Sequence, residues 1–172
     1  MTCNKKISCL LLLLASMTFF GCFRYSFTGT SIPENVNSVY IPFFANQSTS
    51  GIGNLSDRLN DALVDRFINQ TRLQLANSQA SADAVLEGSI VNYTNGPFSV
   101  TGEDETSLNE VTISIRATFK YSEAEKPEWN KSFSASATYD VNENPIDGET
   151  NAAVEALGRA ANNMFNDAVS GW

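Results

Sequence analysis

Two segments in the second half of the chain alternate apolar and polar side chains residue by residue. In 111–121 and 129–139 every second residue is apolar, except at Lys131, and the residues between are mostly Ser, Thr or Asn. This period of two predicts strands with one buried face and one polar face. The link SEAEKPE between them has the length of a hairpin connection, so we expect these two strands to pair antiparallel.

Three further segments have the composition of strands. They are 38–44 (SVYIPFF), 72–78 (RLQLANS) and 82–94 (ADAVLEGSIVNYT). Pro42 cannot donate a hydrogen bond to a neighbouring strand, which predicts an edge position or a bulge for the first of them. Gly88 marks a possible bulge in the third.

A helical period follows the loop at 45–54. Within 55–70 the large apolar residues recur every fourth position while most charged residues fall elsewhere, which predicts an amphipathic helix facing the core. The recurring residues are Leu55, Leu59, Leu63 and Phe67. Asn54 is placed as the N-cap of this helix. The polar face of the helix is not basic, so it does not match a helix that lies on a membrane surface.

A second helix is predicted at the end of the chain, after the turn-rich segment 140–149. One helical stripe collects its apolar side chains. The members are Val154, Leu157, Ala161, Met164, Phe165, Ala168, Val169 and Trp172. Gly158 lies within this element. Glycine lowers the stability of a helix by about 1 kcal/mol relative to Ala, unless a close neighbour requires the space.

The order of these elements favours one α+β domain over 38–172. Each helix has one apolar stripe and the sheet has one apolar face, so the simplest arrangement buries all three surfaces together. We therefore expect a two-layer sandwich, with two helices packed on one face of a mainly antiparallel or mixed sheet of four to five strands. The other face of that sheet is rich in Ser and Thr and carries few charges.

The first 22 residues have the pattern of an export signal that ends in a cysteine. Lys5 and Lys6 precede an apolar run at 7–15, and Gly21 stands immediately before Cys22. This order is typical of a secretory signal peptide, and the run is too short for an ordinary membrane-spanning helix. A small residue before a cysteine is similar to the bacterial lipoprotein signal, although Phe19 and Phe20 stand where Leu and a small residue are usual.

Two interpretations of Cys22 follow from this pattern. In the first, residues 1–21 are a lipoprotein signal peptide, Cys22 is the lipid attachment site, and 22–37 is a lead to the fold. In the second, the protein is secreted with Cys22 free. The first is favoured because the other two cysteines, Cys3 and Cys9, would be removed, and an unpaired cysteine in an exported protein needs an explanation. Acyl chains gain about 0.8 kcal/mol per buried CH₂, so two or more anchor a domain stably.

The charge of the exported chain narrows its possible partners. Without Lys5 and Lys6 it holds nine basic and 19 acidic residues, a formal charge of −10. Such a surface argues against nucleic acid and against electrostatic attachment to anionic lipid headgroups. We expect the lipid anchor, rather than the protein surface, to hold the domain at a membrane.

The composition also limits catalytic and metal chemistry. The chain contains no histidine, which excludes a Ser-His-Asp or Cys-His nucleophile and a zinc site of the usual His/Cys type. Asp140, Asn142 and Asn144 have the spacing of a calcium loop, but Pro145 stands where Gly is required and Asn151 where a bidentate Glu is required. The acidic segment 102–106 is interpreted as a solvated hairpin tip. We expect no catalytic residue, cofactor or metal.

Four segments together give a family resemblance over nearly the whole exported chain. They are CFRYSFTGTSIP at 22–33, LVDRFINQTRLQLANS at 63–78, NEVTISIRATFKY at 109–121 and MFNDAVSGW at 164–172. Their order and spacing resemble the LptE family, in its Bacteroidetes-type branch. One departure is that Phe23 and Arg24 precede Tyr25, where the family often has Gly-Tyr or Gly-Trp directly after the cysteine.

The resemblance implies a function as well as a fold. It implies an outer-membrane lipoprotein that forms a heterodimer with the β-barrel protein LptD, plugs its lumen and assists the placement of lipopolysaccharide in the outer leaflet. A polar, mostly uncharged sheet face suits the hydrated interior of a barrel, although many such faces simply meet water. Only Cys22 carries over from the family by residue, because the loops expected to meet lipid phosphates, 101–109 and 142–150, are acidic here.

The expected location and the competing functions complete this interpretation. FRYSFTGT after Cys22 lacks the acidic cluster that some surface-exposed lipoproteins carry there, so we expect the anchored domain to face the periplasm. One alternative is an accessory lipoprotein of another envelope machine, because fold does not fix function. The other is a tethered periplasmic hydrolase that works through carboxylates, which requires two acidic side chains converging in a pocket.

Overall fold

The two alternating segments form long neighbouring strands in the computed structural model, which describes residues 32–98, 108–143 and 145–170. The strands are β1 (Ser38–Tyr40), β2 (Ala45–Asn46), β3 (Gln74–Leu75), β4 (Ala84–Phe98), β5 (Leu108–Tyr121) and β6 (Trp129–Asp140). The helices are α2 (Leu55–Val64) and α3 (Pro145–Val169). Helix α2 continues as a π-helical turn (Asp65–Asn69), and a short 3₁₀ turn (Gln79–Ser81) precedes β4.

Strands β4, β5 and β6 form an antiparallel meander that is the largest part of the sheet. Ile115 pairs with Ile90 on β4 and with Phe133 on β6, and all three face the core. The predicted antiparallel pairing of the two alternating strands is confirmed. The acidic segment 102–106 between β4 and β5 lies outside the described residues.

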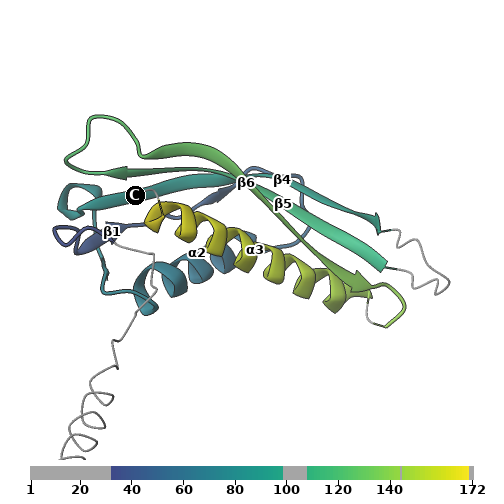
Figure 1. Ribbon diagram of the computed structural model, residues 1–172. Coiled ribbons are helices and arrows are strands. Elements are labelled where there is room, and N and C mark those ends of the chain that lie inside the picture. Colours follow the sequence, from purple (N-terminus) through teal and green to yellow (C-terminus); the bar gives the residue numbers. More distant parts are fainter. Residues whose placement is uncertain (1–31, 99–107, 144, 171–172) are drawn as a thin grey trace, which may run out of the picture.

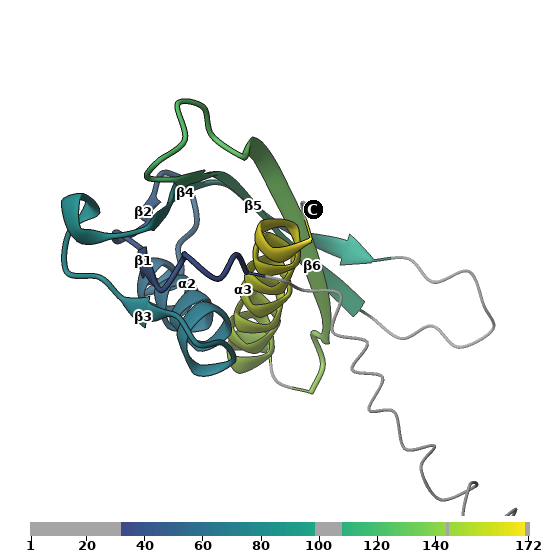
Figure 2. The same ribbon diagram turned by 60° about the vertical axis from the view of Figure 1, so that its left-hand side comes forward.

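The sheet is mixed and has six strands, slightly more than the four to five expected. The order is β3-β1-β4-β5-β6, and β2 pairs separately with β4. The three short strands β1, β2 and β3 all pair in parallel. The predicted α+β class and the two layers are confirmed: Figures 1 and 2 show α2 and α3 on the same side of the sheet.

Two details of the predicted strands are wrong. Pro42 lies neither on an edge strand nor in a bulge but in the loop that connects β1 to β2. Because β1 is paired on both sides, the strand ends before the residue that cannot donate. The irregularity of β4 lies between Ile90 and Asn92 rather than at Gly88. Gly88 instead leaves room for close neighbours, since a Cβ there would lie 2.3 Å from the Arg116 carbonyl oxygen and 2.6 Å from the Phe44 ring.

Other boundaries shift by a few residues. The segment expected as a strand at 72–78 pairs only at Gln74–Leu75, and the expected loop at 45–54 begins with β2. Asn54 occupies the N-cap position of α2 but has a φ of 59° and makes no side-chain capping bond. In this left-handed conformation its carbonyl still accepts the first helical hydrogen bond, from the Arg58 N–H at 3.0 Å.

Helix α3 starts inside the segment expected to be a turn. Proline is favoured in the first helical turn because its missing N–H has no intrahelical partner there, which fits a start at Pro145. Most of the predicted stripe is buried, together with four alanines that the pattern left out: Ala152, Ala153, Ala156 and Ala160. Val154, expected in the stripe, is 37% exposed, and Trp172 lies outside the described residues.

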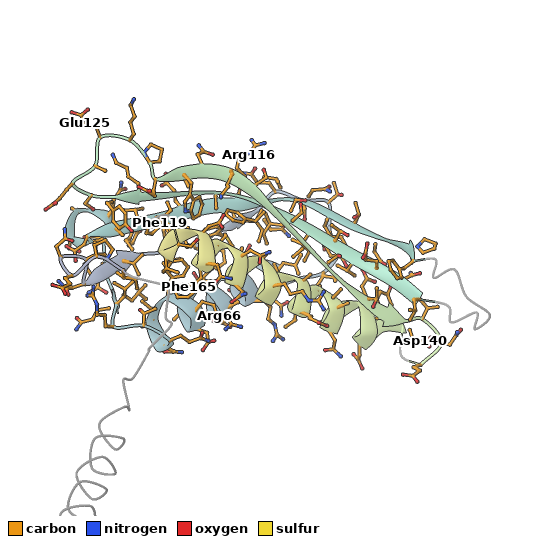
Figure 3. All side chains as sticks on the ribbon, in the orientation of Figure 1. Arg66, Arg116, Phe119, Glu125, Asp140 and Phe165 are labelled. Atoms are coloured by element: carbon orange, nitrogen blue, oxygen red, sulfur yellow. The ribbon has the colours of Figure 1, made fainter. Side chains whose placement is uncertain are left out.

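The core lies between the sheet and the two helices. Small residues along α3 bring the helix close to β5 and β6, while larger side chains fill the space beside α2. The Phe67 ring meets Phe165 edge-on at 5.2 Å between centroids and lies 6.4 Å from Phe119. Figure 3 shows Phe119 beside the sheet and Phe165 on the side of α3 that faces α2. This arrangement leaves the opposite side of the meander free to meet other molecules.

Candidate functional site: a polar sheet face and a tethered corner

The side of the meander turned away from the helices is here called the outer face. Its residues follow from the strand register, because successive side chains of a strand point to opposite faces of the sheet. Away from the strand ends, where Val85, Lys120, Leu108 and Asp140 continue the same register, they are Glu87, Ser89, Asn92 and Thr94 on β4, Glu110, Thr112, Ser114, Arg116 and Thr118 on β5, and Asn130, Ser132, Ser134, Ser136 and Thr138 on β6. Figure 3 shows Arg116 projecting away from the helices. Eleven of these fourteen side chains are Ser, Thr or Asn.

The middle of the outer face is rich in hydroxyl groups and internally hydrogen-bonded, with Glu110 and Arg116 on either side of it along β5. The Ser114 and Ser134 hydroxyls lie 2.7 Å apart, and the Ser136 hydroxyl donates to Glu110 Oε1 at 2.9 Å. Hydroxyl and amide groups both donate and accept. Most of the face can therefore meet a polar partner or water through groups that donate and accept, and Glu87, Glu110 and Arg116 are the charged side chains among those named.

Strand β6 is an edge strand, and basic side chains partly cover that edge. The Arg159 guanidinium donates to the Ser136 carbonyl at 2.7 Å and to Glu155 at 2.6 Å. Lys131 pairs with Asp167 of α3. Lys131 replaces an apolar residue in the alternation, and an inward charge on an edge strand discourages pairing with another chain. These contacts disfavour uncontrolled edge-to-edge association.

A polar cluster occupies one end of the sandwich, beside an open cavity of about 790 Å³. The Tyr93 hydroxyl donates to Glu149 Oε1 at 2.6 Å, and the Asn95 amide donates to the Tyr139 hydroxyl at 2.8 Å. Burial raises the pKa of Tyr93 well above its usual range, and the Glu149 carboxylate adds to the rise. The cluster ties β4 and β6 to the first turns of α3.

The opposite end holds the segment that leads into β1. The Arg72 guanidinium donates to the carbonyls of Ile32 at 3.1 Å and Val36 at 2.7 Å. Asp83 Oδ2 accepts from the N–H groups of Asn37 and Ser38, both at 2.9 Å. The Asn37 N–H, and after it the Ser38 hydroxyl and the Ser38 N–H, lower the pKa of Asp83. Two charged side chains therefore fix the path of residues 32–38.

A cleft of about 430 Å³ lies beside this fixed segment, at the start of the β5–β6 link. Its lining combines apolar and polar side chains from three parts of the chain. They are Pro33, Asn35, Val36, Asp83, Tyr121, Ser122, Glu123 and Ala124. Burial and the nearby Glu128 carboxylate raise the pKa of Tyr121. We refer to this feature as the lead cleft.

Three carboxylates in the described part of the chain share one surface hollow, and two of them already have partners. Asp140, Glu143 and Glu155 line one surface hollow of about 270 Å³, but Glu155 is paired with Arg159, and Asp140 accepts from the Asn142 N–H at 2.8 Å. The helix that begins at Pro145 interrupts the calcium-like spacing. Within the described ranges no group of three His, Cys, Asp or Glu side chains is placed to hold a metal ion.

The single site residue predicted from the sequence, Cys22, lies outside the described residues. The Arg72 and Asp83 contacts were not predicted, because their partners include backbone groups 36 to 46 residues away along the chain. The Tyr93–Glu149 bond was also missed, since no sequence signal joins β4 to α3. In the part of the chain that the structure describes, no helix combines the length and apolarity needed to cross a membrane.

Solved structures with this architecture support the fold. Protein XCC0632 from Xanthomonas campestris is 14% identical with a TM-score of 0.56, over 83% of this chain and 90% of that one. Uncharacterized lipoprotein B from Nitrosomonas europaea is 11% identical with a TM-score of 0.51, over 78% of this chain and 83% of that one. At these identities the likeness concerns the fold alone.

The sequence comparisons identify the family. No curated protein sequence matches this chain significantly. The profile of the LptE family, described as lipopolysaccharide-assembly, matches residues 36–168, which span every strand and helix of the sandwich except the last residue of α3. The resemblance found in the sequence is confirmed: the chain belongs to the LptE family of lipopolysaccharide-assembly proteins.

Proposed function

We propose that this protein is an outer-membrane lipoprotein that plugs the lumen of the LptD β-barrel and assists the delivery of lipopolysaccharide to the outer leaflet. Family membership supports a role in lipopolysaccharide assembly. Cys22 is the lipid attachment site in this proposal, residues 1–21 are the signal peptide, and the domain faces the periplasm. The protein acts by binding rather than by catalysis.

The observation that carries the proposal is the outer face. A plug inside a barrel meets a wall of alternating side chains that is polar and hydrated. The outer face offers hydroxyl and amide groups over three adjacent strands, with an uncharged centre around Ser114 and Ser134. Charged groups in such a contact must be desolvated and matched, whereas hydroxyls adapt as donors or acceptors.

A direct test isolates the protein from gently solubilised outer membranes and identifies the barrel that accompanies it. We expect LptD in a one-to-one complex. Recovery of a different membrane protein complex, or of no barrel, would contradict the plug proposal, while the fold and the family would still hold.

A variant pair locates the contact on the outer face. Ser134→Glu places a charge in the uncharged centre, and Gln79→Glu adds the same charge at an exposed site on the 3₁₀ turn away from the meander. We expect Ser134→Glu to reduce LptD recovery about tenfold, the effect of roughly 1.4 kcal/mol, and Gln79→Glu to leave it unchanged. Equal recovery of both variants would place the contact elsewhere. Mass spectrometry of the purified protein tests acylation of Cys22 independently.

A further inference from the structure

The lead cleft is open at the place where the chain enters the fold. Its lining brings Pro33 and Val36 together with Tyr121, at the end of β5, and Ala124, in the link that follows. Ile32, the first described residue, packs against the core, and Arg72 fixes its carbonyl. Every residue before Ile32 therefore leaves from a fixed point beside this cleft.

The chemistry of the cleft matches the segment that precedes it. The cleft offers apolar surface with an acidic rim formed by Asp83 and Glu123, and none of its lining residues is basic. The three hydrogen bonds that Asp83 accepts all end on Oδ2. Residues 23–27 read FRYSF: three aromatic side chains and one cation, Arg24, which is the only basic residue between Cys22 and Arg58.

The length of the chain allows the segment to reach the cleft. Phe27 is five residues before Ile32, and an extended chain spans at most about 3.5 Å per residue, so it reaches roughly 17 Å. An aromatic side chain that enters a cleft of apolar and aromatic residues gains from burial and ring contacts. A guanidinium beside a carboxylate adds a charge-assisted hydrogen bond.

We propose that residues 23–27 dock into the lead cleft of their own domain, with an aromatic side chain between Pro33 and Tyr121 and with Arg24 at the acidic rim formed by Asp83 and Glu123. The docked segment holds Cys22 close to one end of the sandwich instead of on a free linker. If Cys22 carries the lipid, as proposed above, this end is fixed at the membrane. Figure 3 shows Glu125, in the link beside the cleft, and Asp140 at opposite ends of the molecule, so the end with Asp140 points away from the lipid.

Cleavage by trypsin after Arg24 measures the docking. Proteolysis of a segment that opens quickly follows the population of its open form. In the purified full-length mature protein, the rate of cleavage at Arg24 is read by mass spectrometry and compared with the rate in the same chain unfolded by urea. We expect cleavage to be at least about tenfold slower in the folded protein, which corresponds to roughly 1.4 kcal/mol of docking. The readout does not depend on LptD.

A matched pair of Trp substitutions assigns the protection to the cleft. Ala124→Trp fills the cleft, and Ala80→Trp makes the same change on the exposed 3₁₀ turn, which does not line it. We expect Ala124→Trp to bring cleavage at Arg24 to the rate of the unfolded chain and Ala80→Trp to leave it slow. The double substitution Tyr25→Ser and Phe27→Ser, which lies outside the described fold, should accelerate cleavage in the same way if Ala124→Trp does not fold.

Three results would overturn the proposal. The first is cleavage of the folded wild-type chain at the unfolded rate. The second is slow cleavage that neither Ala124→Trp nor the double substitution accelerates, which would mean that the detergent micelle shields Arg24. The third is an equal acceleration by Ala80→Trp, which would show a general loosening of the fold.

Discussion

The two faces of strand β5 differ although their residues alternate along one chain. Val111, Ile113 and Ile115 have no exposed surface, while the neighbouring Ser114 lies on the outer face and bonds to Ser134 across the strand pair. Burial fixes the first set, because each side chain fills a defined space against the helices. No such packing acts on the second set. The inner face thus specifies the fold, and the outer face is free to be shaped by what it meets.

The largest difference in stability is expected between substitutions of two neighbouring residues on β5, one on each face of the sheet. Ile115→Ala removes buried apolar surface and leaves a cavity, which should lower the free energy of unfolding by about 2–5 kcal/mol. Ser114→Ala, one residue earlier, removes a hydrogen bond on the accessible face and should cost about 0.5–1 kcal/mol. Urea unfolding of both variants measures the contrast. Similar losses in the two variants would mean that the outer face also packs against part of the chain.

Gly88 tests the close packing of the inner face in a second way, because it lies on that face but has no side chain. Gly88→Ala places a Cβ against the Arg116 carbonyl oxygen and the Phe44 ring, at 2.3 Å and 2.6 Å. We expect a loss of about 1–3 kcal/mol in the free energy of unfolding. A double-mutant cycle with Phe44→Leu should recover only part of it, since the carbonyl belongs to the β5 backbone. Full recovery would assign the whole strain to the ring.

Much of the fold was predictable because it rests on periodicity. The alternation in β5 and β6 identifies both strands and their buried faces, and the two helical stripes identify the layer that covers them. The errors occur where local rules compete with distant contacts. Gly88 was predicted to mark a bulge, but its missing side chain lets Phe44 pack closely against β4. The small strands β2 and β3, each two residues long, exist only because of their neighbours in the sheet.

Less of the candidate site was predictable. The polar composition of the outer face follows from the same alternation that predicts the strands. The Arg72 contacts with Val36 and the Asp83 contacts with Asn37 do not, because a side chain that binds distant backbone groups leaves no sequence pattern. The lead cleft likewise depends on how the 33–36 turn meets the β5–β6 link. Cys22 depends on export chemistry, and the fold of the domain does not test it.

The polar cluster at the end of the sandwich gives a smaller, pH-dependent effect. Tyr93→Phe removes the 2.6 Å bond to Glu149 and should cost about 1 kcal/mol at neutral pH. The pKa of Tyr93 is raised above the usual 10.0 in the folded protein. The unfolded chain therefore ionises first, and the contribution of Tyr93 is present below pH 10 and lost as the pH rises above it.

Alkaline titration of stability isolates this residue. Tyr121 also has a raised pKa, so both tyrosines steepen the loss of stability above pH 10 in the wild type. We expect the Tyr93→Phe variant to lose less stability than the wild type between neutral pH and the alkaline range. Parallel curves for the two proteins would show that Tyr93 ionises equally in the folded and unfolded chains.

The smallest expected effect is a gain in stability at Gly158 of α3, which belongs to neither face of the sheet. Gly158 lies within the helix, its φ is not positive, and a Cβ there would meet nothing within 4 Å. Gly158→Ala should therefore raise the free energy of unfolding by about 0.5–1 kcal/mol, through the lower backbone entropy of the unfolded chain. The urea midpoint should rise with an unchanged m-value, and a loss of stability would contradict the prediction. Because the isolated domain leaves this space open, the same variant also tests the partner: unchanged LptD recovery would leave this position of α3 out of the contact, and reduced recovery despite higher stability would extend the contact to this side of α3.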